Sequence, residues 1–210
     1  MISDHSGDLA LIFDFGGVLV DWDPRHLYRK LFRGDEAAME RFLEEVHFAE
    51  WNLQQDAGRP FAQAVDALCA EFPQYCELIR AYDTRWEESI KSPIEDSVKI
   101  LYTLKELGCS LHGLSNWSVE KFELARHKYE FFDWFETILI SGEVGINKPD
   151  PRIFQIMLER VQRQPTDCLL IDDSLRNIET AYHMRFHTIH FRSPEQLRTE
   201  LETRGILKGN

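Results

Sequence analysis

The sequence lacks several features that would each point to a particular class of protein. It has no apolar stretch as long as a membrane-spanning helix, although 43% of its 210 residues are hydrophobic. Its 36 Asp and Glu residues outnumber 24 Lys and Arg residues, which leaves a net charge of −12. Nucleic acids and anionic membrane surfaces attract clustered basic side chains, so neither is an expected partner. A small anionic substrate is compatible with this charge if its site contains a cation.

Cysteine is scarce as well. Cys69, Cys76, Cys109 and Cys168 are scattered along the chain, with no close pairing of the kind that binds metals. Cys109 and Cys168 adjoin predicted buried strands, where a thiol serves as a small apolar side chain in a reducing compartment. The first eight residues are polar and acidic, which predicts no signal peptide. We therefore expect a cytoplasmic protein.

The stretch from Leu9 to Phe13 is five apolar residues in a row, which predicts a strand buried on both faces. It stops at Asp14, and glycines follow at Gly16 and Gly17. Glycines let the backbone turn tightly, so the Asp14 carboxylate is placed to project into a crevice. An ordinary turn would contain the same residue types, so this motif alone leaves both interpretations open.

The segment 21–92 predicts a helical insertion. Asp23-Pro24 is typical of a helix start, and apolar residues recur at helical spacing up to about Ile90. Breaks at 33–35, 58–60 and Pro73 divide the segment into four predicted helices without a strand. We therefore expect a core made of residues 1–20 and 93–210, with residues 21–92 inserted into it.

After Pro93, strand and helix patterns alternate. Short apolar runs at 109–114, 137–140, 168–171 and 188–191 each predict a buried strand, and amphipathic helices separate them. With 9–13 these make five strands joined through helices, which is typical of a parallel sheet with right-handed crossovers. The predicted fold class is α/β, a Rossmann-like parallel sheet with an inserted helical bundle.

Polar residues stand at the ends of the predicted strands. These are Asp14, Ser115-Asn116 and Asp172-Asp173, and Lys148 lies just before a helix on the same edge. Open α/β sheets bind ligands outside the carboxyl ends of their strands. Three carboxylates in one pocket favour a hard divalent cation such as Mg2+, which also brings a phosphate with it. Taken singly, Ser115 and Asn116 are equally compatible with a turn, and Lys148 with a solvated loop.

Four motifs in this order resemble those of the haloacid dehalogenase-like hydrolase superfamily. They are Phe-Asp-Phe-Gly-Gly-Val-Leu, Leu-Ser-Asn, Asn-Lys-Pro-Asp-Pro and Ile-Asp-Asp-Ser, within about 9–191. The resemblance implies that the insertion is the family's smaller helical cap and that Asp14 is a nucleophile forming an aspartyl-phosphate. It implies that Ser115 and amides beside Asn116 bind the phosphoryl group and that Lys148 balances charge. The implied Mg2+ ligands are Asp14, the Gly16 carbonyl, Asp173 and, directly or through water, Asp172.

The first motif departs from most of the family's phosphatases at Gly16. Those enzymes have Asp-x-Asp there, and the second Asp protonates the leaving group. The Asp-x-Gly found here resembles a subgroup of sugar-phosphate phosphatases that includes glucose-1-phosphate phosphatases. Without that acid, anomeric sugar phosphates and aryl phosphates should react faster than primary alkyl phosphates. The competing view is that a cap residue or an ordered water donates the proton.

Three functions are therefore open. The first is a Mg2+-dependent phosphatase acting on a small phosphomonoester, a sugar phosphate with anomeric preference. The second is a dehalogenase in which Asp14 attacks a halide-bearing carbon without metal, and the third is a non-catalytic binder of a phosphorylated ligand. The doublet Asp172-Asp173 favours the first, because a dehalogenase has no use for a metal site. The cap residues considered for specificity are Trp51, Gln54, Gln55, Tyr82 and Trp86, although such aromatic residues are usually core.

Overall fold

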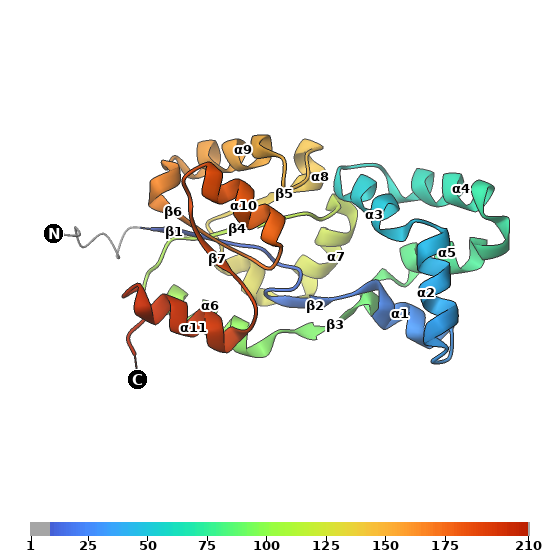
Figure 1. The fold of residues 1–210 in the computed structure, drawn as a ribbon, viewed down its shortest axis with the longest axis horizontal. Helices are drawn as coiled ribbons and strands as arrows, with labels where there is room; N and C mark the ends of the chain where they lie inside the picture. The colour runs from blue at the N-terminus through green and yellow to red at the C-terminus, as the bar shows by residue number, and fades with distance from the viewer. Residues whose placement is uncertain (1–8, 210) are drawn as a thin grey trace.

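The computed structural model describes residues 9–209. Residues 1–8, on which the prediction of no signal peptide rests, lie outside this range. A five-stranded sheet forms the centre of the molecule, with strand order β5-β4-β1-β6-β7 and every pair parallel (Figure 1). Its strands are β1 (Ala10–Phe13), β4 (Leu111–Ser115), β5 (Thr137–Ile140), β6 (Cys168–Asp172) and β7 (His187–His190). The predicted parallel α/β sheet is confirmed, and β1 lies at its centre.

Helices cover both faces of the sheet, because alternate residues of a strand point to opposite sides. Leu11 and Phe13 belong to one apolar cluster, with residues of α6 (Glu95–Glu106), α7 (Val119–Lys128) and α11 (Pro194–Thr203). Ala10 and Ile12 belong to the other, with residues of α9 (Pro151–Val161) and α10 (Leu175–His183). Figure 1 shows α6 and α11 below the sheet and α9 and α10 above it. The short helix α8 (Ser141–Val144) directly follows β5.

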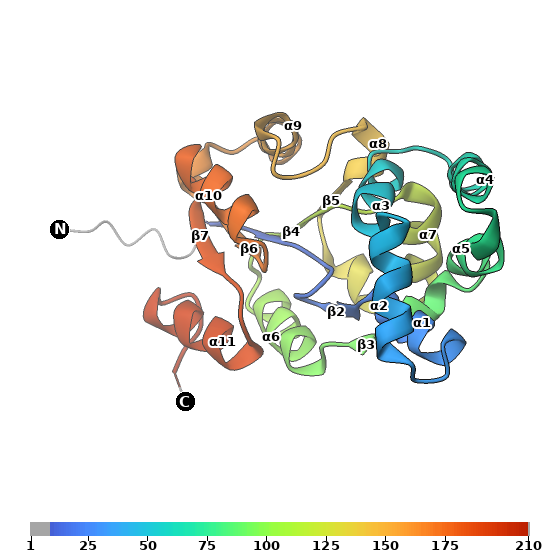
Figure 2. The same ribbon diagram turned by 45° about the vertical axis from the view of Figure 1, so that its right-hand side comes forward.

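The helical insertion, residues 21–92, lies beyond the carboxyl end of β1 (Figures 1 and 2). Its two ends, β2 (Val20–Trp22) and β3 (Ile90–Pro93), pair as an antiparallel ribbon. The helices between them are α1 (Pro24–Leu31), α2 (Glu36–Glu45), α3 (Phe48–Asp56), α4 (Phe61–Glu71) and α5 (Cys76–Thr84). Short 3-10 turns occur at Pro73–Tyr75, Trp86–Ser89, Glu130–Trp134 and Pro165–Asp167.

The prediction of four helices without a strand is wrong on both counts. The predicted second helix is divided at His47, whose backbone is left-handed with φ of 48°. A left-handed residue ends one helix, and a second helix leaves in a new direction. Nothing in the apolar spacing indicated this break, because Val46 and Trp51 on either side of it are both buried.

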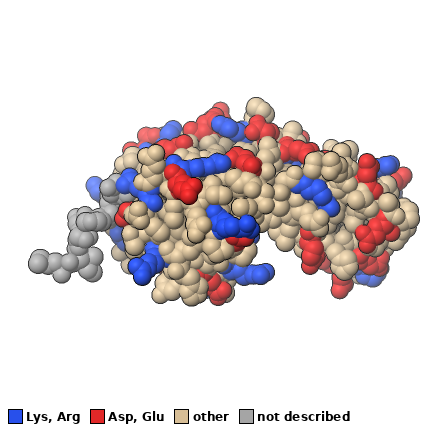
Figure 3. All heavy atoms as spheres, turned by 90° about the horizontal axis from the view of Figure 1, so that it is seen from above, with Lys and Arg blue, Asp and Glu red and all other residues tan. Residues whose placement is uncertain are grey.

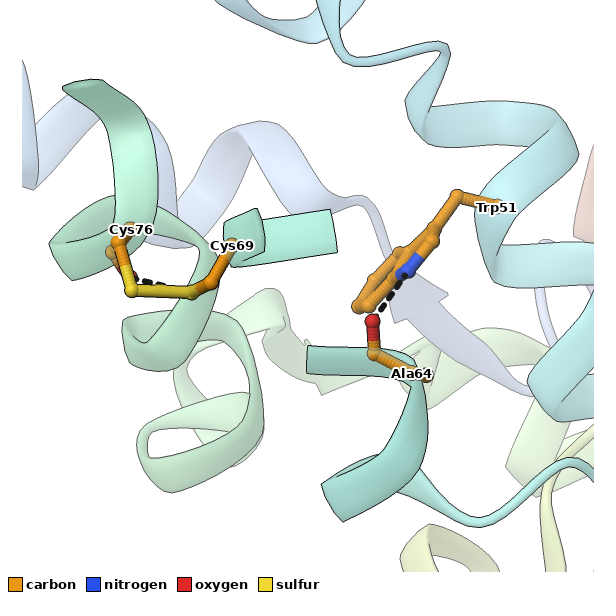
Figure 4. Close-up of a disulfide and its surroundings, with 4 residues drawn as sticks. All are labelled: Trp51, Ala64, Cys69 and Cys76. Atoms are coloured by element: carbon orange, nitrogen blue, oxygen red, sulfur yellow. Dashed lines mark hydrogen bonds between the residues drawn. A yellow bond between two sulfur atoms is a disulfide. The ribbon is translucent and has the colours of Figure 1, made fainter. Parts of the chain in front are cut away.

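A disulfide joins Cys69 near the end of α4 to Cys76 at the start of α5 (Figure 4). The sequence predicted no such pair, and a reducing compartment would keep both as thiols. Cys168 is buried and free, as expected of a strand residue. The same close-up shows the Trp51 indole N–H donating to the Ala64 carbonyl at 3.2 Å, which ties α3 to α4. Trp51 is therefore a packing residue.

The helices and the surface charge of the structure match what the composition led us to expect. Among the described residues, no helix is both long and apolar enough to cross a bilayer. Figure 3 shows acidic and basic side chains interspersed over one face, without a continuous basic band on that face.

Candidate active site

Asp14 lies just past the end of β1, in the middle of the sheet edge. Its side chain is buried, and only 7% of the residue is exposed. The Phe15 backbone N–H and the Ser115 hydroxyl both donate to Oδ1, each at 2.7 Å. Ser115 ends β4, the strand beside β1, so the parallel order of the sheet brings these two groups together. Two donors therefore fix the carboxylate, and Oδ2 faces the second half of the site.

Lys148 supplies the positive charge of this edge. Its ammonium group lies 2.8 Å from Asp14 Oδ2 and 2.6 Å from Asp172 Oδ2, and it also donates to the Leu114 carbonyl at 2.8 Å. Its side chain is 1% exposed. Asp150 caps the following helix α9 and accepts from the Arg152 N–H, which places Lys148 just before the helix, as the sequence predicts. The alternative of a solvated loop lysine is therefore wrong.

Asn116 positions Lys148. Its amide nitrogen donates to the Lys148 carbonyl at 2.9 Å, and its amide oxygen accepts from the Lys148 N–H at 2.7 Å. This two-way pairing uses both ends of the side-chain amide. The side chain of Asn116 therefore serves the site by fixing the backbone of Lys148.

Asp172 is fully buried at the end of β6. Besides Lys148, it accepts from the Ser174 N–H at 2.9 Å and from the Asn177 amide at 2.9 and 3.1 Å. Asn177 is a residue that the sequence reasoning missed. Its position one turn into the helix after Asp172-Asp173 was the available signal. Together these contacts hold Asp172 against Lys148.

Asp173 reaches the site from the solvent side and is exposed. Gly17, with φ of +72°, makes room for it: a Cβ atom at Gly17 would stand 2.2 Å from Asp173 Oδ2. His190 on β7 contacts the Asp173 carbonyl at 3.0 Å through its ring nitrogen. Gly17 was expected as a turn residue, and the close approach of the Asp173 side chain requires a glycine there as well.

Electrostatics at this edge are dominated by uncompensated negative charge. Burial raises the pKa of Asp14 to about 7, against the lowering effect of Lys148. Partial desolvation of its carboxyl group, and then the charge of Asp172, raise the pKa of Asp173, although the residue is exposed as a whole. Burial acts to lower the pKa of Lys148, but Asp14 and Asp172 outweigh it and hold that pKa above its usual range. One ammonium group therefore faces three carboxylates.

The donor set fits a hard divalent cation. Asp14, Asp172 and Asp173 each offer an oxygen, and these oxygens lie within 4.8 Å of one another. Carboxylate oxygens are the ligands that Mg2+ prefers, and a cation would favour the ionised forms of Asp14 and Asp173 against the burial and repulsion that raise their pKa values. Asp172 accepts from Lys148 and Asn177, and Asp14 from Ser115 and Lys148, so Asp173 is the most accessible of the three carboxylates to a metal.

A small cavity of about 50 Å³ connects this edge with the helical insertion. Gly16 and Asn116 line it from the core. The insertion contributes Asn52, Asp56 and a set of aromatic side chains that includes Tyr82 and Trp86. Of the specificity candidates, Tyr82 and Trp86 reach the cavity, whereas Gln55 is buried and donates to the Trp51 carbonyl. Gln54 is exposed.

Asp56 is the cavity's only carboxylate among the described residues, and the sequence reasoning missed it. It is the last residue of α3 and is half-buried. Burial raises its pKa to about 7, and the charge of Asp14 acts in the same direction. An acidic residue at a helix C-terminus opposes the helix dipole. That conflict, just before the Gly58 break, was the signal in the sequence.

Several hydrogen bonds hold the insertion against the core. The Ser141 hydroxyl accepts from the Trp117 N–H at 2.9 Å and donates to the Asp56 carbonyl at 2.5 Å. On α7, Glu120 accepts from the Phe61 N–H at 3.0 Å, and Lys121 donates to the Asp83 carbonyl at 2.9 Å. These contacts fix the distance across the cavity.

Comparisons with known proteins agree on the fold. The model of the haloacid dehalogenase-like hydrolase family matches residues 9–183. D-ribitol-5-phosphate phosphatase from Bacteroides thetaiotaomicron is 22% identical over 197 residues, covering 91% of this chain and 95% of that protein. Drimenol cyclase drtB from Aspergillus calidoustus is 24% identical over 195 residues, covering 91% of this chain and 35% of that protein.

The solved structures include a HAD family enzyme, BT-2542, from Bacteroides thetaiotaomicron in complex with magnesium and inorganic phosphate. It is 24% identical, with a TM-score of 0.68, and the match covers 89% of this chain and 96% of that one. The chain also spans only 19% to 38% of the length of several longer curated relatives that it matches.

Proposed function

This chain belongs to the haloacid dehalogenase-like hydrolase family, and we propose that it is a Mg2+-dependent phosphatase of small phosphomonoesters. The observation that carries this proposal is the cluster of Asp14, Lys148, Asp172 and Asp173 at one edge of the sheet. It combines a fixed carboxylate nucleophile, a buried cation and oxygen ligands for a metal. Relatives with 91% coverage of this chain include a sugar-alcohol phosphate phosphatase, which supports the same reaction class.

Asp14 is the proposed nucleophile. Its carboxylate attacks phosphorus, the bond to the alcohol oxygen breaks, and an aspartyl-phosphate forms that water then hydrolyses. Ser115 and the Phe15 N–H, which fix Oδ1, prevent the carboxylate from rotating away from the substrate. Lys148 favours the ionised form of Asp14 against the effect of burial, and its ammonium group, 2.8 Å from Asp14 Oδ2, is placed to share charge with the transferred group. Positioning and charge neutralisation account for most of the catalysis in phosphoryl transfer.

The proposed Mg2+ ligands are Asp14, the Gly16 carbonyl and Asp173, with Asp172 nearby. When bound, the cation neutralises phosphate charge and helps to align the phosphoryl group. Asp172 has a second task, because it holds Lys148 and is itself held by Asn177. The amides beside Asn116 are proposed to donate to the phosphoryl oxygens, together with the Ser115 hydroxyl, whose single proton would turn from Asp14 to the phosphoryl group when substrate binds.

Three finer points are proposals as well. Residues 21–92 are the cap and residues 1–20 and 93–210 the core. The substrate is a sugar phosphate, and its preference for the anomeric position holds only if no other residue supplies the leaving-group proton. The protein acts in the cytoplasm.

The test is phosphate release from a panel of phosphorylated metabolites, with and without Mg2+. We expect release that depends on Mg2+ and that Asp14→Asn abolishes, because the amide is not nucleophilic. Asp173→Ala should raise the Mg2+ concentration needed for half-maximal rate. Circular dichroism and thermal unfolding control for the fold of each variant.

Two outcomes would overturn the proposal. Chloride release from a 2-chloro acid without Mg2+ would identify a dehalogenase. Saturable binding of phosphorylated ligands, without turnover by the wild type under any metal condition, would identify a non-catalytic binder. An Asp14→Asn variant with a tenth of wild-type turnover would remove Asp14 from its role.

A further inference from the structure

We propose that Asp56, on the helical insertion, donates the proton to the leaving-group oxygen, in place of the acid that the first motif lacks at Gly16. This inference rests on the proposed phosphatase function and names a catalytic residue for it. It assigns to the insertion a direct part in the chemistry, beyond the recognition of substrate.

The first support is the position of the carboxyl group. Gly16 and Asp56 line the same cavity, one from the core and the other from the insertion. A Cβ atom at Gly16 would meet no atom within 4 Å, so the place of the missing side chain is open space. Asp14, two residues before Gly16, is near enough for its charge to act on the Asp56 carboxyl group. Asp56 is the carboxylate that the insertion contributes to this cavity, so a leaving group that entered the cavity from a phosphate at Asp14 would meet it.

The second support is the way in which Asp56 is held. The Asn52 amide donates to Asp56 Oδ2 at 3.0 Å, and the Tyr82 hydroxyl donates to Asn52 Oδ1 at 3.1 Å. The Tyr82 contact fixes which end of the amide faces Asp56. Asn52 thus presents a donor to Oδ2, so Oδ2 is an acceptor and Oδ1 is the oxygen that can carry the proton. The Ser141 hydroxyl fixes the backbone of Asp56 against the core.

The third support is the protonation state. Burial raises the pKa of Asp56 to about 7, the Asp14 charge acts in the same direction, and hydrogen bonds from Ser118 and Asn52 oppose it. A general acid works best when its pKa is near the working pH. Burial raises the pKa of the Tyr82 hydroxyl, which makes it a weaker acid than Asp56, and its proton is already donated to Asn52.

The proton and the bonds balance over two steps. In the first, Asp14 attacks phosphorus, the P–O bond to the alcohol breaks, and the alcohol oxygen takes the Asp56 proton. In the second, water attacks the aspartyl-phosphate, and its proton returns to the Asp56 carboxylate as Asp14 is released. Asp56 also lines an outer groove of about 680 Å³ between the insertion helices, which gives it contact with solvent.

The experiment measures single-turnover rates for a series of aryl phosphates of rising leaving-group pKa and for one primary alkyl phosphate. The wild type should depend weakly on leaving-group pKa. Asp56→Asn should lose little on the most acidic phenol and ~10²–10⁴-fold on the alkyl phosphate, the usual range for general acid catalysis. Asp66→Asn is the matched control, since Asp66 is exposed on α4 and makes the same change outside the cavity. It should follow the wild type throughout.

A rescue distinguishes chemistry from structure. Gly16→Asp added to Asp56→Asn should restore alkyl phosphate hydrolysis, because a Cβ atom at Gly16 meets no atom within 4 Å and the residue lines the cavity. Uniform slowing of Asp56→Asn over all substrates would overturn the inference and leave Asp56 a structural residue. A wild type with steep dependence on leaving-group pKa would overturn it without any variant. Both results leave the phosphatase proposal intact, whereas a wild type that releases no phosphate overturns that proposal itself.

Discussion

Two buried lysines mark the two working regions of the molecule, and their surroundings differ. At the sheet edge, the Lys148 side chain is 1% exposed, and its partners Asp14 and Asp172 are 11% and 0% exposed. At the junction with the insertion, the Lys121 side chain is 8% exposed, but its partner Asp83 is 30% exposed. Lys121 also lies over the Phe61 ring, 4.4 Å from its centre.

The difference shows what each lysine is for. An ion pair with one hydrated partner relieves little charge and serves mainly to hold two elements together. A lysine between two carboxylates that water does not reach is indispensable to both, because either carboxylate alone would be an unpaired buried charge. The core region is therefore specialised for charge and the junction for attachment. Three paired substitutions can test this contrast.

The largest effect is expected from Lys148→Met. It leaves Asp14 and Asp172 facing each other without a cation, which should cost about 3–5 kcal/mol of unfolding free energy at neutral pH. Turnover of bound substrate should fall at least as much as affinity, because the charge acts on the transferring group. Urea unfolding and phosphate release measure the two effects.

Lys121→Met is the matched control for that change. Asp83 can take up water when the ammonium group is lost, so we expect a cost of about 1 kcal/mol. Equal losses of stability in the two variants would mean that the sheet edge is no more sensitive to charge than the junction, and would break the comparison.

The next effect concerns how tightly the sheet edge is packed. Gly17→Ala requires a left-handed alanine, at a cost of about 1–2 kcal/mol, and its Cβ displaces the Asp173 carboxylate. Phosphate release by this variant should therefore need more Mg2+. Gly108→Ala is the control, because Gly108 also has a positive φ, +76°, but a Cβ atom there would meet no atom within 4 Å. An unchanged Mg2+ titration for Gly17→Ala would show that Asp173 is free to move.

The smallest loss of stability is expected from a substitution at the junction between the insertion and the core. Glu120→Ala removes the acceptor for the Phe61 N–H at the start of α4, which should cost about 0.5–1.5 kcal/mol. Glu123→Ala, on the exposed face of the same helix, should cost less than half as much. Thermal unfolding measures the loss of stability in both variants. A larger loss for Glu123→Ala would mean that contacts other than the Glu120 hydrogen bond hold the insertion against the core.

The residues of the sheet edge were predictable from the sequence, whereas those that the helical insertion presents to the cavity were not, for a physical reason. Asp14, Ser115 and Asp172 each end an apolar run, and a parallel sheet must bring such ends together. The insertion is built from helices whose aromatic residues repeat at the same spacing whether they pack, as Trp51 does, or line a cavity, as Tyr82 does. Periodicity reports burial but not what a buried residue faces.

Several features of single residues were not predicted from the sequence, for related reasons. The left-handed His47, which divides α2 from α3, and the pairing of Cys69 with Cys76 both depend on tertiary contacts. Asn177 and Asp56 carry no motif of their own. Asp56 did break a local rule by placing a carboxylate at a helix C-terminus, and such conflicts are expected where function overrides stability.

The hydroxyl of Ser141 has a consequence for how this protein could diversify. By bonding both the loop after β4 and the end of α3, it ties Asp56 to the sheet edge independently of the outer helices. Among the described residues, none from α1 or α2 lines the inner cavity, whereas Arg25 and Glu40 on those helices line the outer groove. Mutations accumulating in α1 and α2 would thus change the outer groove, while the tie between Asp56 and the sheet edge is inherited unchanged.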